Sequence, residues 1–502
     1  MSSTSTLHGA GLAEPAVGRG SRFRAPAIGP LGTRPLAALL GLAGAVVSML
    51  GSWNPSFWGD EAASVMSAER PLATLWGELG RVDAVHGAYY VFLHFWIQLV
   101  GASEFAVRLP SAIAIGIAVA GTVVLANMLL TRQIAVAAGI IFMVLPRITL
   151  IATEGRSYAI ATALAVWSSV LLVTLLRRRV TRLLPWLAYG AVVALSIYFF
   201  LYLVLLAGIH LFVVLSTKGT RVFLRRWLAA AGVAVVLAGP VLAYGLTQHH
   251  QIAFLAKRNY ATAQSVVVTQ WFDSPWLAIA GWLLLVVGSV LIVRRFRADA
   301  VLLLGWFALP TAALMIGNSL VAPMYSTRYV SFCTPAVAIV MAVGLSSLRR
   351  NWIRVLAIVA LIALAVPSYL SERGQYAKNN SDFRQVSQVV AEHSSPGDAV
   401  VFDETVKPSV KPRLAIHLYS QDFAGLRDVT LTTPYSRLSG IWDAVSPITA
   451  ARLGTTRTVW ALELSGAGVP ADVLRLQSLG YAVTNQFPVH LTTVYELTRE
   501  TP

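Results

Sequence analysis

The sequence predicts a polytopic α-helical membrane protein that ends in a small α/β domain. The chain of 502 residues is 56% apolar and has a mean hydropathy of +0.66. Apolar runs of about 18 residues or more recur through residue 370, and each is long enough to cross a bilayer about 30 Å thick. The net charge of +16 comes from short basic clusters between these runs. That pattern sets membrane topology, so we do not expect nucleic-acid binding.

The eleven predicted spans share long apolar stretches with few charges. They are residues 35–52, 106–130, 133–150, 158–176, 185–199, 201–217, 227–247, 275–293, 300–321, 330–348 and 353–370. The aromatic segment 86–101 is not counted among them. We predict that it is an interfacial helix within one external loop, 53–105, because this choice puts the basic clusters between the spans on the cytosolic side.

The segments before and after the spans differ in composition from the membrane part. Residues 1–34 are rich in Gly, Ala, Pro and Arg and are expected to form a disordered cytosolic tail. Residues 371–502 carry 13 acids and 12 bases, with β-like runs at 399–402, 459–464 and 492–497. Eleven spans and a cytosolic N-terminus place this α/β domain outside the cytoplasm. The single cysteine, Cys333, excludes an intramolecular disulfide framework.

Acidic residues are rare in the membrane part and gather on the predicted external side. Only ten Asp or Glu precede residue 371, and eight of them face outward in this topology. Asp and Glu hardly influence topology, and charge near a bilayer is costly, so these acids indicate a functional site. Asp60 and Glu61 are adjacent, just beyond the first span. They are either the first turn of a helix, favoured by its dipole, or a catalytic base with its neighbour.

Further polar residues on the external side complete four groups. The groups are Asp60 with Glu61; Asp83 with His86; Arg147 with Glu154, Arg156 and Tyr158; and Lys257 and Arg258 with Arg328 and Tyr329. Carboxylates suit proton abstraction from a hydroxyl, and Arg, Lys and Tyr at a membrane surface suit a phosphate. Simpler explanations remain open. Arg147 and Arg156 can neutralise Glu154, Lys257 and Arg258 can be solvated loop charges, and His86 can cap a helix or form a hydrogen bond within the loop.

Three short motifs resemble those of a known family. They are Trp58-Gly59-Asp60-Glu61-Ala62, Ser103-Glu104-Phe105-Ala106-Val107-Arg108-Leu109-Pro110-Ser111 and Glu154-Gly155-Arg156-Ser157-Tyr158. Across residues 35–370 the chain resembles the GT-C glycosyltransferases that use polyprenyl-phosphate sugars. The similar branch contains the protein O-mannosyltransferases, the lipid A aminoarabinose transferases and the actinobacterial mannosyl- and arabinosyltransferases.

This resemblance implies a GT-C fold and a role for each matching residue. The first-loop aspartate, which is the family's catalytic base, falls on Asp60, and Glu61 would tune it or help to hold a metal. The second-loop acid falls on Glu154, with Arg156 and Tyr158 after it. Phosphate-side residues fall on Arg328 and Tyr329.

The resemblance has one gap and leaves one question open. The family often has His-Pro-Pro-Leu or Lys-Pro-Pro-Leu where this chain has His86-Gly87-Ala88-Tyr89, so a lysine is missing at the phosphate-contacting position. Some relatives bind a divalent metal ion, for which this chain has acids but no dedicated cluster. The metal therefore stays open.

The predicted function is that of an integral glycosyltransferase of the cell membrane. A polyprenyl-phosphate donor would supply the sugar. The Ala/Val/Leu/Arg-rich composition is typical of actinobacteria and favours mannose or arabinofuranose, and we expect mannose ahead of arabinofuranose. The acceptor would be an envelope glycan, glycolipid or protein on the outer face. A transporter or flippase of polyprenyl-linked glycans is the alternative, but it should carry polar groups near the midplane of several spans. Here most spans are free of charge through their middles. A non-catalytic scaffold would leave Asp60 dispensable.

Overall fold

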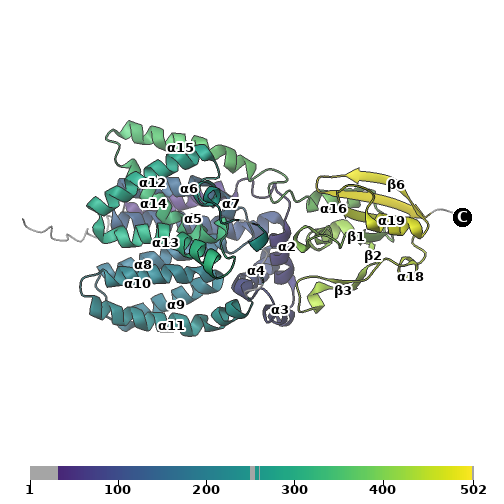
Figure 1. Cartoon of the computed structure of the whole chain (residues 1–502), viewed down its shortest axis with the longest axis horizontal. Helices are drawn as coiled ribbons and strands as arrows, with labels where there is room; N and C mark the ends of the chain where they lie inside the picture. The colour runs from purple at the N-terminus through teal and green to yellow at the C-terminus, as the bar shows by residue number, and fades with distance from the viewer. Residues whose placement is uncertain (1–31, 249–250, 252–254, 259, 500–502) are drawn as a thin grey trace, which may run out of the picture.

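The computed structural model describes residues 32–248, 251, 255–258 and 260–499. It consists of a bundle of apolar helices, with a β-sheet domain at one end (Figure 1). Most of the predicted tail, up to residue 31, lies outside the described residues.

Each predicted span coincides with a helix or with two consecutive helices. The bundle helices are α1 (Thr33–Met49), α5 (Glu104–Leu129), α6 (Arg132–Val144), α7 (Pro146–Ala152), α8 (Tyr158–Arg177), α9 (Leu183–Phe199), α10 (Val204–Leu215), α11 (Thr220–Thr247), α12 (Pro275–Arg295), α13 (Arg297–Leu320), α14 (Thr334–Leu345) and α15 (Asn351–Ser371). Among the described residues, seven helices are long and apolar enough to cross a membrane, or eight if α6 and α7 form one bent span. When α6 and α7 are counted as one span, three shorter apolar helices bring the eight to the predicted eleven.

Burial divides the bundle into a centre and a periphery. Every residue of α14 is buried, and α5 and α8 are buried along most of their length. In contrast, α15 exposes large apolar side chains such as Val359, Val366 and Leu370. Exposed apolar side chains on a long helix suit contact with lipid. The chain is a multi-pass membrane protein, and its peripheral helices face the bilayer.

The third predicted span, 133–150, is broken in the structure. Helix α6 ends at Val144, and α7 begins at Pro146 at an angle of 59° to it. Proline lacks the N–H that a continuous helix needs and disfavours a helical conformation in the preceding residue. Leu145 is accordingly extended, and Pro146 takes the first position of α7, where proline is well accommodated. The predicted span is therefore present as a pair of helices, with a bend that the sequence analysis did not predict.

The predicted external loop contains four short helices between the bundle and the β-sheet domain (Figure 1). They are α2 (Gly59–Glu69), α3 (Leu72–Leu79), the 3-10 helix η1 (Ala84–His86) and α4 (Gly87–Val100). Helix α4 has 14 residues and is shorter than the roughly 20 residues that a transmembrane helix needs. It buries Tyr89, Tyr90 and Leu93 and exposes Phe95 and Leu99. This amphipathic helix fits an interfacial position.

The C-terminal domain is built on a mixed five-stranded sheet in the order β2-β1-β5-β7-β6. Its strands are β1 (Ala399–Phe402), β2 (Arg427–Asp428), β5 (Thr458–Leu464), β6 (Tyr481–Pro488) and β7 (Thr492–Arg499), with α16 (Phe383–His393) and α19 (Ala471–Ser478) among its helices. Strand β1 runs parallel to β2 and β5, and β7 runs antiparallel to β5 and β6. The three predicted strands are present. Strand β6 was not predicted because it is an edge strand with mostly exposed residues.

The C-terminal domain packs directly on the start of α2. The 3-10 helix η6 (Pro408–Val410) approaches so closely that a Cβ atom at Gly59 would lie 2.2 Å from the carbonyl oxygen of Ser409. Ser381 donates a hydrogen bond of 2.6 Å to the carbonyl oxygen of Phe57. Ala62 and Met66 of α2 belong to the same buried cluster as the sheet residue Val400. This packing fixes the position of the residues that follow Gly59.

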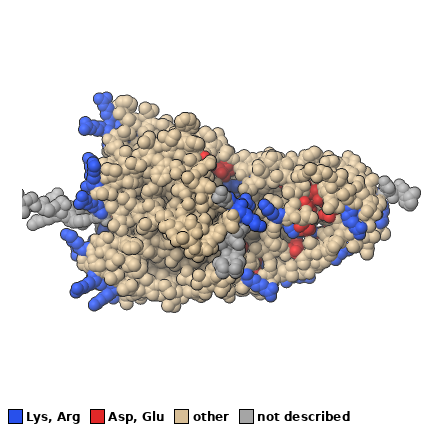
Figure 2. Space-filling view, in the orientation of Figure 1, with Lys and Arg blue, Asp and Glu red and all other residues tan. Residues whose placement is uncertain are grey.

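Basic side chains gather at the end of the bundle that lies away from the C-terminal domain (Figure 2). Arg177 at the end of α8 pairs with Asp299 at the start of α13 at 3.5 Å. Arg354 at the start of α15 donates to Gln133 at the start of α6. The predicted basic clusters to which these residues belong therefore lie at one end of the molecule.

In the described part of the C-terminal domain, one buried carboxyl oxygen has no hydrogen-bond partner. Glu463 at the end of β5 is 3% exposed, and its Oε1 atom makes no hydrogen bond to the described residues. It lines a hollow of about 130 Å³ together with Asp403 and Asp472. Burial, with the nearby charges of Asp472 and Asp403, raises the pKa of Glu463 from 4.5 to about 9.

We expect Glu463→Gln to raise the free energy of unfolding at pH 7 by about 1–3 kcal/mol. Between pH 4.5 and about 9 the folded protein holds a proton that the unfolded chain has released. The stability of the natural protein therefore falls as the pH rises through this window, whereas glutamine cannot ionise. Thermal unfolding of both full-length proteins at pH 5 and pH 8 measures the difference. Parallel pH profiles would contradict the prediction.

Candidate active site

Asp60 lies in the first turn of α2, where the helix dipole favours a negative charge. Its Oδ2 atom is 3.4 Å from the Nη1 atom of Arg328, and its Oδ1 atom makes no hydrogen bond to the described residues. The side chain is 34% exposed. Both explanations of this acid are thus compatible with the structure, because Asp60 stabilises a helix start and still presents a free oxygen.

Arg328 links Asp60 to a second carboxylate. It comes from the 3-10 helix η5 (Thr327–Cys333), and its Nη1 atom is also 3.6 Å from Oε1 of Glu154. The guanidinium lies over the ring of Trp58, 4.9 Å from the ring centroid. The planar group is thereby held between two acids from different loops.

Glu154 is the buried member of this group. Its side chain is 4% exposed, and its Oε2 atom has no hydrogen-bond partner among the described residues. Burial raises the pKa of Glu154, although the charges of Arg328 and Lys378 act against the increase. Its ion-pair partner is Arg328, so the alternative that Arg147 and Arg156 neutralise it does not match the observed pairing.

Arg156 contacts the backbone of α2 on the other side of Asp60. Its Nη1 atom donates to the carbonyl oxygen of Asp60 at 3.2 Å and to Oγ of Ser64 at 3.0 Å. Its Nη2 atom lies 3.3 Å from Nε2 of His86. A guanidinium only donates hydrogen bonds, so this histidine nitrogen accepts and the ring is neutral. Arg156 therefore ties His86 to the N-terminal turn that carries Asp60.

The surroundings of His86 favour its neutral form. Burial and the Arg156 charge lower the pKa of His86 to about 4. Asp83 precedes it with a left-handed backbone conformation and accepts a hydrogen bond of 2.8 Å from the Tyr90 hydroxyl. His86 makes no side-chain cap hydrogen bond to α4, so the capping explanation does not hold in the structure.

Aromatic rings form a wall beside these charges. Tyr158 and Tyr329 lie with ring centroids 6.4 Å apart, and Tyr202 lies 5.4 Å from Tyr329. Phe200 packs edge-on against Tyr158 and Tyr329. Two predicted site residues thus become neighbours although they are far apart in the sequence.

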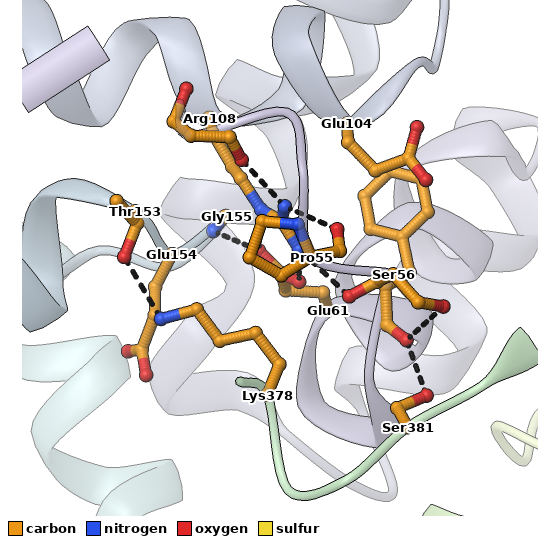
Figure 3. Close-up of polar contacts among 12 residues, drawn as sticks. Pro55, Ser56, Glu61, Glu104, Arg108, Thr153, Glu154, Gly155, Lys378 and Ser381 are labelled. Atoms are coloured by element: carbon orange, nitrogen blue, oxygen red, sulfur yellow. Dashed lines mark hydrogen bonds and ion pairs between the residues drawn. The ribbon is translucent and has the colours of Figure 1, made fainter. Parts of the chain in front are cut away.

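Glu61 points away from Asp60 into a buried ion pair. Its two carboxylate oxygens accept hydrogen bonds from Arg108 at 2.8 Å and 2.6 Å, and Oε1 also accepts from the Gly155 N–H at 2.7 Å (Figure 3). Both side chains of the pair are fully buried. A carboxylate enclosed in this way does not fit the predicted tuning or metal-holding role. Sequence reasoning quoted Arg108 only as part of a motif and missed it as the partner.

Two of the predicted phosphate residues do not join the group. Lys257 and Arg258 are exposed, and neither side chain makes an ion pair or hydrogen bond to the described residues. This placement fits the alternative of solvated loop charges and does not support their assignment to the site.

Other cations line a cavity of about 340 Å³ next to Arg328. Arg147 from α7 and Lys378 from the segment after α15 contribute to its wall, together with Glu154. Lys378 was missed because it lies beyond the last span and was counted with the soluble domain. The sequence did offer one indication of its role: Lys378 follows an apolar helix on the side of the molecule where the acidic residues gather.

The residues present do not fit a divalent metal ion. In the described part of the chain, no three Asp, Glu, His or Cys side chains come close enough to hold one. Asp60 and Glu154 both face Arg328, and Glu61 faces Arg108. The negative charges of these acids are therefore compensated by arginine and lysine side chains.

The arrangement combines a partly exposed carboxylate with buried cations beside a cavity. Asp60 can accept a proton from a hydroxyl group at its free oxygen. Arg328, Arg147 and Lys378 can stabilise an anion that forms or binds in the cavity. A group suited to proton removal and groups suited to anion stabilisation therefore lie next to the same arginine.

Comparisons with known proteins identify the fold. No protein-family model and no curated protein sequence matches the chain. ArnT from Cupriavidus metallidurans bound to undecaprenyl phosphate has a TM-score of 0.54 at 13% identity, covering 92% of this chain and 98% of that chain. ArnT in the apo state has a TM-score of 0.53 at 12% identity, covering 93% and 98%.

A weaker match is an oligosaccharyltransferase from Archaeoglobus fulgidus, with a TM-score of 0.48 at 11% identity, covering 86% of this chain and 68% of that chain. The two ArnT structures match over nearly the full length of both proteins. The chain therefore has the ArnT fold, which is the GT-C fold that the sequence motifs implied.

Proposed function

We propose that this protein is a glycosyltransferase that transfers a sugar from a polyprenyl-phosphate donor to an acceptor hydroxyl. The observation that carries the proposal is the partly exposed Asp60 carboxylate held 3.4 Å from Arg328. The ArnT fold supports it, because one of the matching structures is bound to undecaprenyl phosphate. Among the predicted residues, Asp60, Asp83, His86, Glu154, Arg156, Tyr158, Arg328 and Tyr329 form the proposed site.

In the proposed mechanism Asp60 is the general base. Its free oxygen takes the proton of the acceptor hydroxyl while that oxygen attacks the anomeric carbon. The bond between the anomeric carbon and the phosphate oxygen breaks, and its electron pair stays on the phosphate. Fixed cations next to the leaving phosphate stabilise the charge that develops there, which is the largest contribution expected in such a site. A single displacement of this kind inverts the anomeric configuration.

We take the substrate from the sequence resemblance and the orientation from the basic clusters and the number of spans. We assign mannose as the sugar ahead of arabinofuranose, and an envelope glycan, glycolipid or protein as the acceptor. The N-terminus would lie in the cytoplasm, and the site and the C-terminal domain outside it. The gathering of basic side chains at the opposite end of the bundle supports this orientation.

The purified full-length protein tests the proposal with two labelled donors in separate reactions, polyprenyl-phospho-mannose and polyprenyl-phospho-arabinofuranose. Lipid and glycan extracts of actinobacterial envelopes serve as acceptors. We expect the mannosyl donor to yield a labelled product and an equal amount of free polyprenyl phosphate. Turnover with the arabinosyl donor alone would change the sugar assignment. Release of polyprenyl phosphate from neither donor would contradict the proposal.

A further inference from the structure

The cavity beside Arg328 is lined by positive side chains from three separate parts of the chain. Arg147 comes from α7, Arg328 from η5, and Lys378 from the segment after α15. Three acids, Glu154, Glu372 and Asp273, also line it. Two of the cations are paired with these carboxylates before any ligand arrives, Arg328 with Glu154 and Lys378 with Glu372.

Arg147 is positioned by the backbone and keeps donors free. Its Nε atom donates to the carbonyl oxygen of Gln270 at 2.7 Å, and its Nη2 atom donates to that of Thr269 at 2.7 Å. Its Nη1 atom makes no hydrogen bond to the described residues, and the residue is 4% exposed. Burying a guanidinium with free donors is costly unless an anion completes its hydrogen bonding. A ligand with negatively charged oxygens would supply these bonds.

Lys378 meets the same cavity from the opposite wall. Its Nζ atom donates to Oγ1 of Thr153 at 2.9 Å and to the Glu372 carboxylate at 3.1 Å, and its side chain lies beside Glu154 (Figure 3). The ammonium group has three N–H donors, so one remains without a partner among the described residues. The side chain is only 4% exposed. A buried lysine with a free donor is a second feature that calls for an anion.

The cavity also lies next to the lipid-facing surface. Ser368 near the end of α15 lines it, and on other parts of its surface the same helix exposes apolar side chains such as Val366 and Leu370. A ligand in this cavity can therefore keep a hydrocarbon chain against α15 while its polar head reaches Arg147 and Lys378. Asp60 lies beyond Arg328 and is not part of the cavity wall.

We propose that this cavity binds the phosphate group of the lipid donor and that Lys378 and Arg147 are its ligands together with Arg328. The inference rests on the proposed function and adds that the donor enters the site from the side of α15. The phosphate then contacts Arg328 from within the cavity, and the acceptor hydroxyl meets Asp60, which contacts the same arginine but does not line the cavity.

Binding of undecaprenyl phosphate to the purified full-length protein tests this inference by native mass spectrometry. We expect Lys378→Ala to weaken binding by about 10- to 150-fold, as the loss of a charge-assisted contact predicts. The matched control is Lys407→Ala, which removes an exposed lysine whose side chain makes no ion pair or hydrogen bond to the described residues. The control should bind as the natural protein does.

A second variant separates phosphate binding from a purely structural ion pair. Glu372→Gln removes the carboxylate partner of Lys378 but keeps the cation, so the lipid phosphate should bind as well as before or more tightly. Equal weakening in Lys378→Ala and Glu372→Gln would mean that only the ion pair matters and would overturn the inference. Unchanged binding in Lys378→Ala would overturn it as well and leave the proposed function standing. A natural protein that does not bind undecaprenyl phosphate would contradict the proposed function itself.

Discussion

Asp60→Asn is expected to reduce turnover by at least about 10²–10⁴-fold, the contribution typical of a positioned general base. Asparagine is nearly isosteric with aspartate and keeps an oxygen that can face Arg328, but it cannot accept a proton. The side chain is 34% exposed and packs little, so the substitution should leave folding unchanged. Turnover with the labelled donor, together with thermal unfolding of the same preparation, measures both effects.

The matched control for Asp60 is the neighbouring acid Asp83. Its Oδ2 atom is already occupied by the Tyr90 hydroxyl at 2.8 Å, so Asp83→Asn should lower turnover far less than Asp60→Asn. Binding of undecaprenyl phosphate should persist in Asp60→Asn, because Asp60 does not line the cavity. Full activity in Asp60→Asn would mean that Asp60 only stabilises the start of α2. Asp83 and Glu154 would then be the next candidates for the base.

The helices and strands could be predicted from the sequence because their signals are local. Apolar length marks a span, and a short run of β-favouring residues marks a strand, so the bundle and three strands of the sheet were identified. The bend between α6 and α7 was also local, since Pro146 stood inside an assigned span. The bend was missed because hydropathy is averaged over a window of many residues, so a single proline hardly changes the value. Strand β6 carried no such signal, since an exposed edge strand lacks alternating apolar residues.

The candidate site could be predicted only in part because it depends on contacts between distant segments. Asp60 and Arg328 are 268 positions apart, and their approach at 3.4 Å follows from how the helices pack. Motif resemblance identified both residues without showing that they are neighbours. Lys378 could not be assigned in this way, since the chain returns to the site after its last span. Residue type alone also does not distinguish an exposed acid from a buried one, and only the structure shows that Asp60 is partly exposed beside Arg328 whereas Glu61 is buried with Arg108.

The second large effect is expected for Glu61→Gln, which should lower the stability of the folded protein. Arg108 is fully buried and also donates to the carbonyl oxygens of Ser52 and Pro55 at 2.7 Å and 2.8 Å. A neutral amide at position 61 leaves this guanidinium without its counter-charge, which typically costs about 3–5 kcal/mol. We expect a correspondingly lower free energy of unfolding and less protein in the membrane.

Thermal unfolding and membrane yield of Glu61→Gln, compared with Asp60→Asn, distinguish the two adjacent acids. Replacing both partners by apolar residues should restore only part of the stability. The carbonyl oxygens around Arg108 and the N–H of Gly155 would remain without partners. A Glu61→Gln protein that folds normally but has lost turnover would return Glu61 to the catalytic role that the motif implied. Because Glu61 holds Gly155, the residue between Glu154 and Arg156, its loss should disorder both loops of the site together.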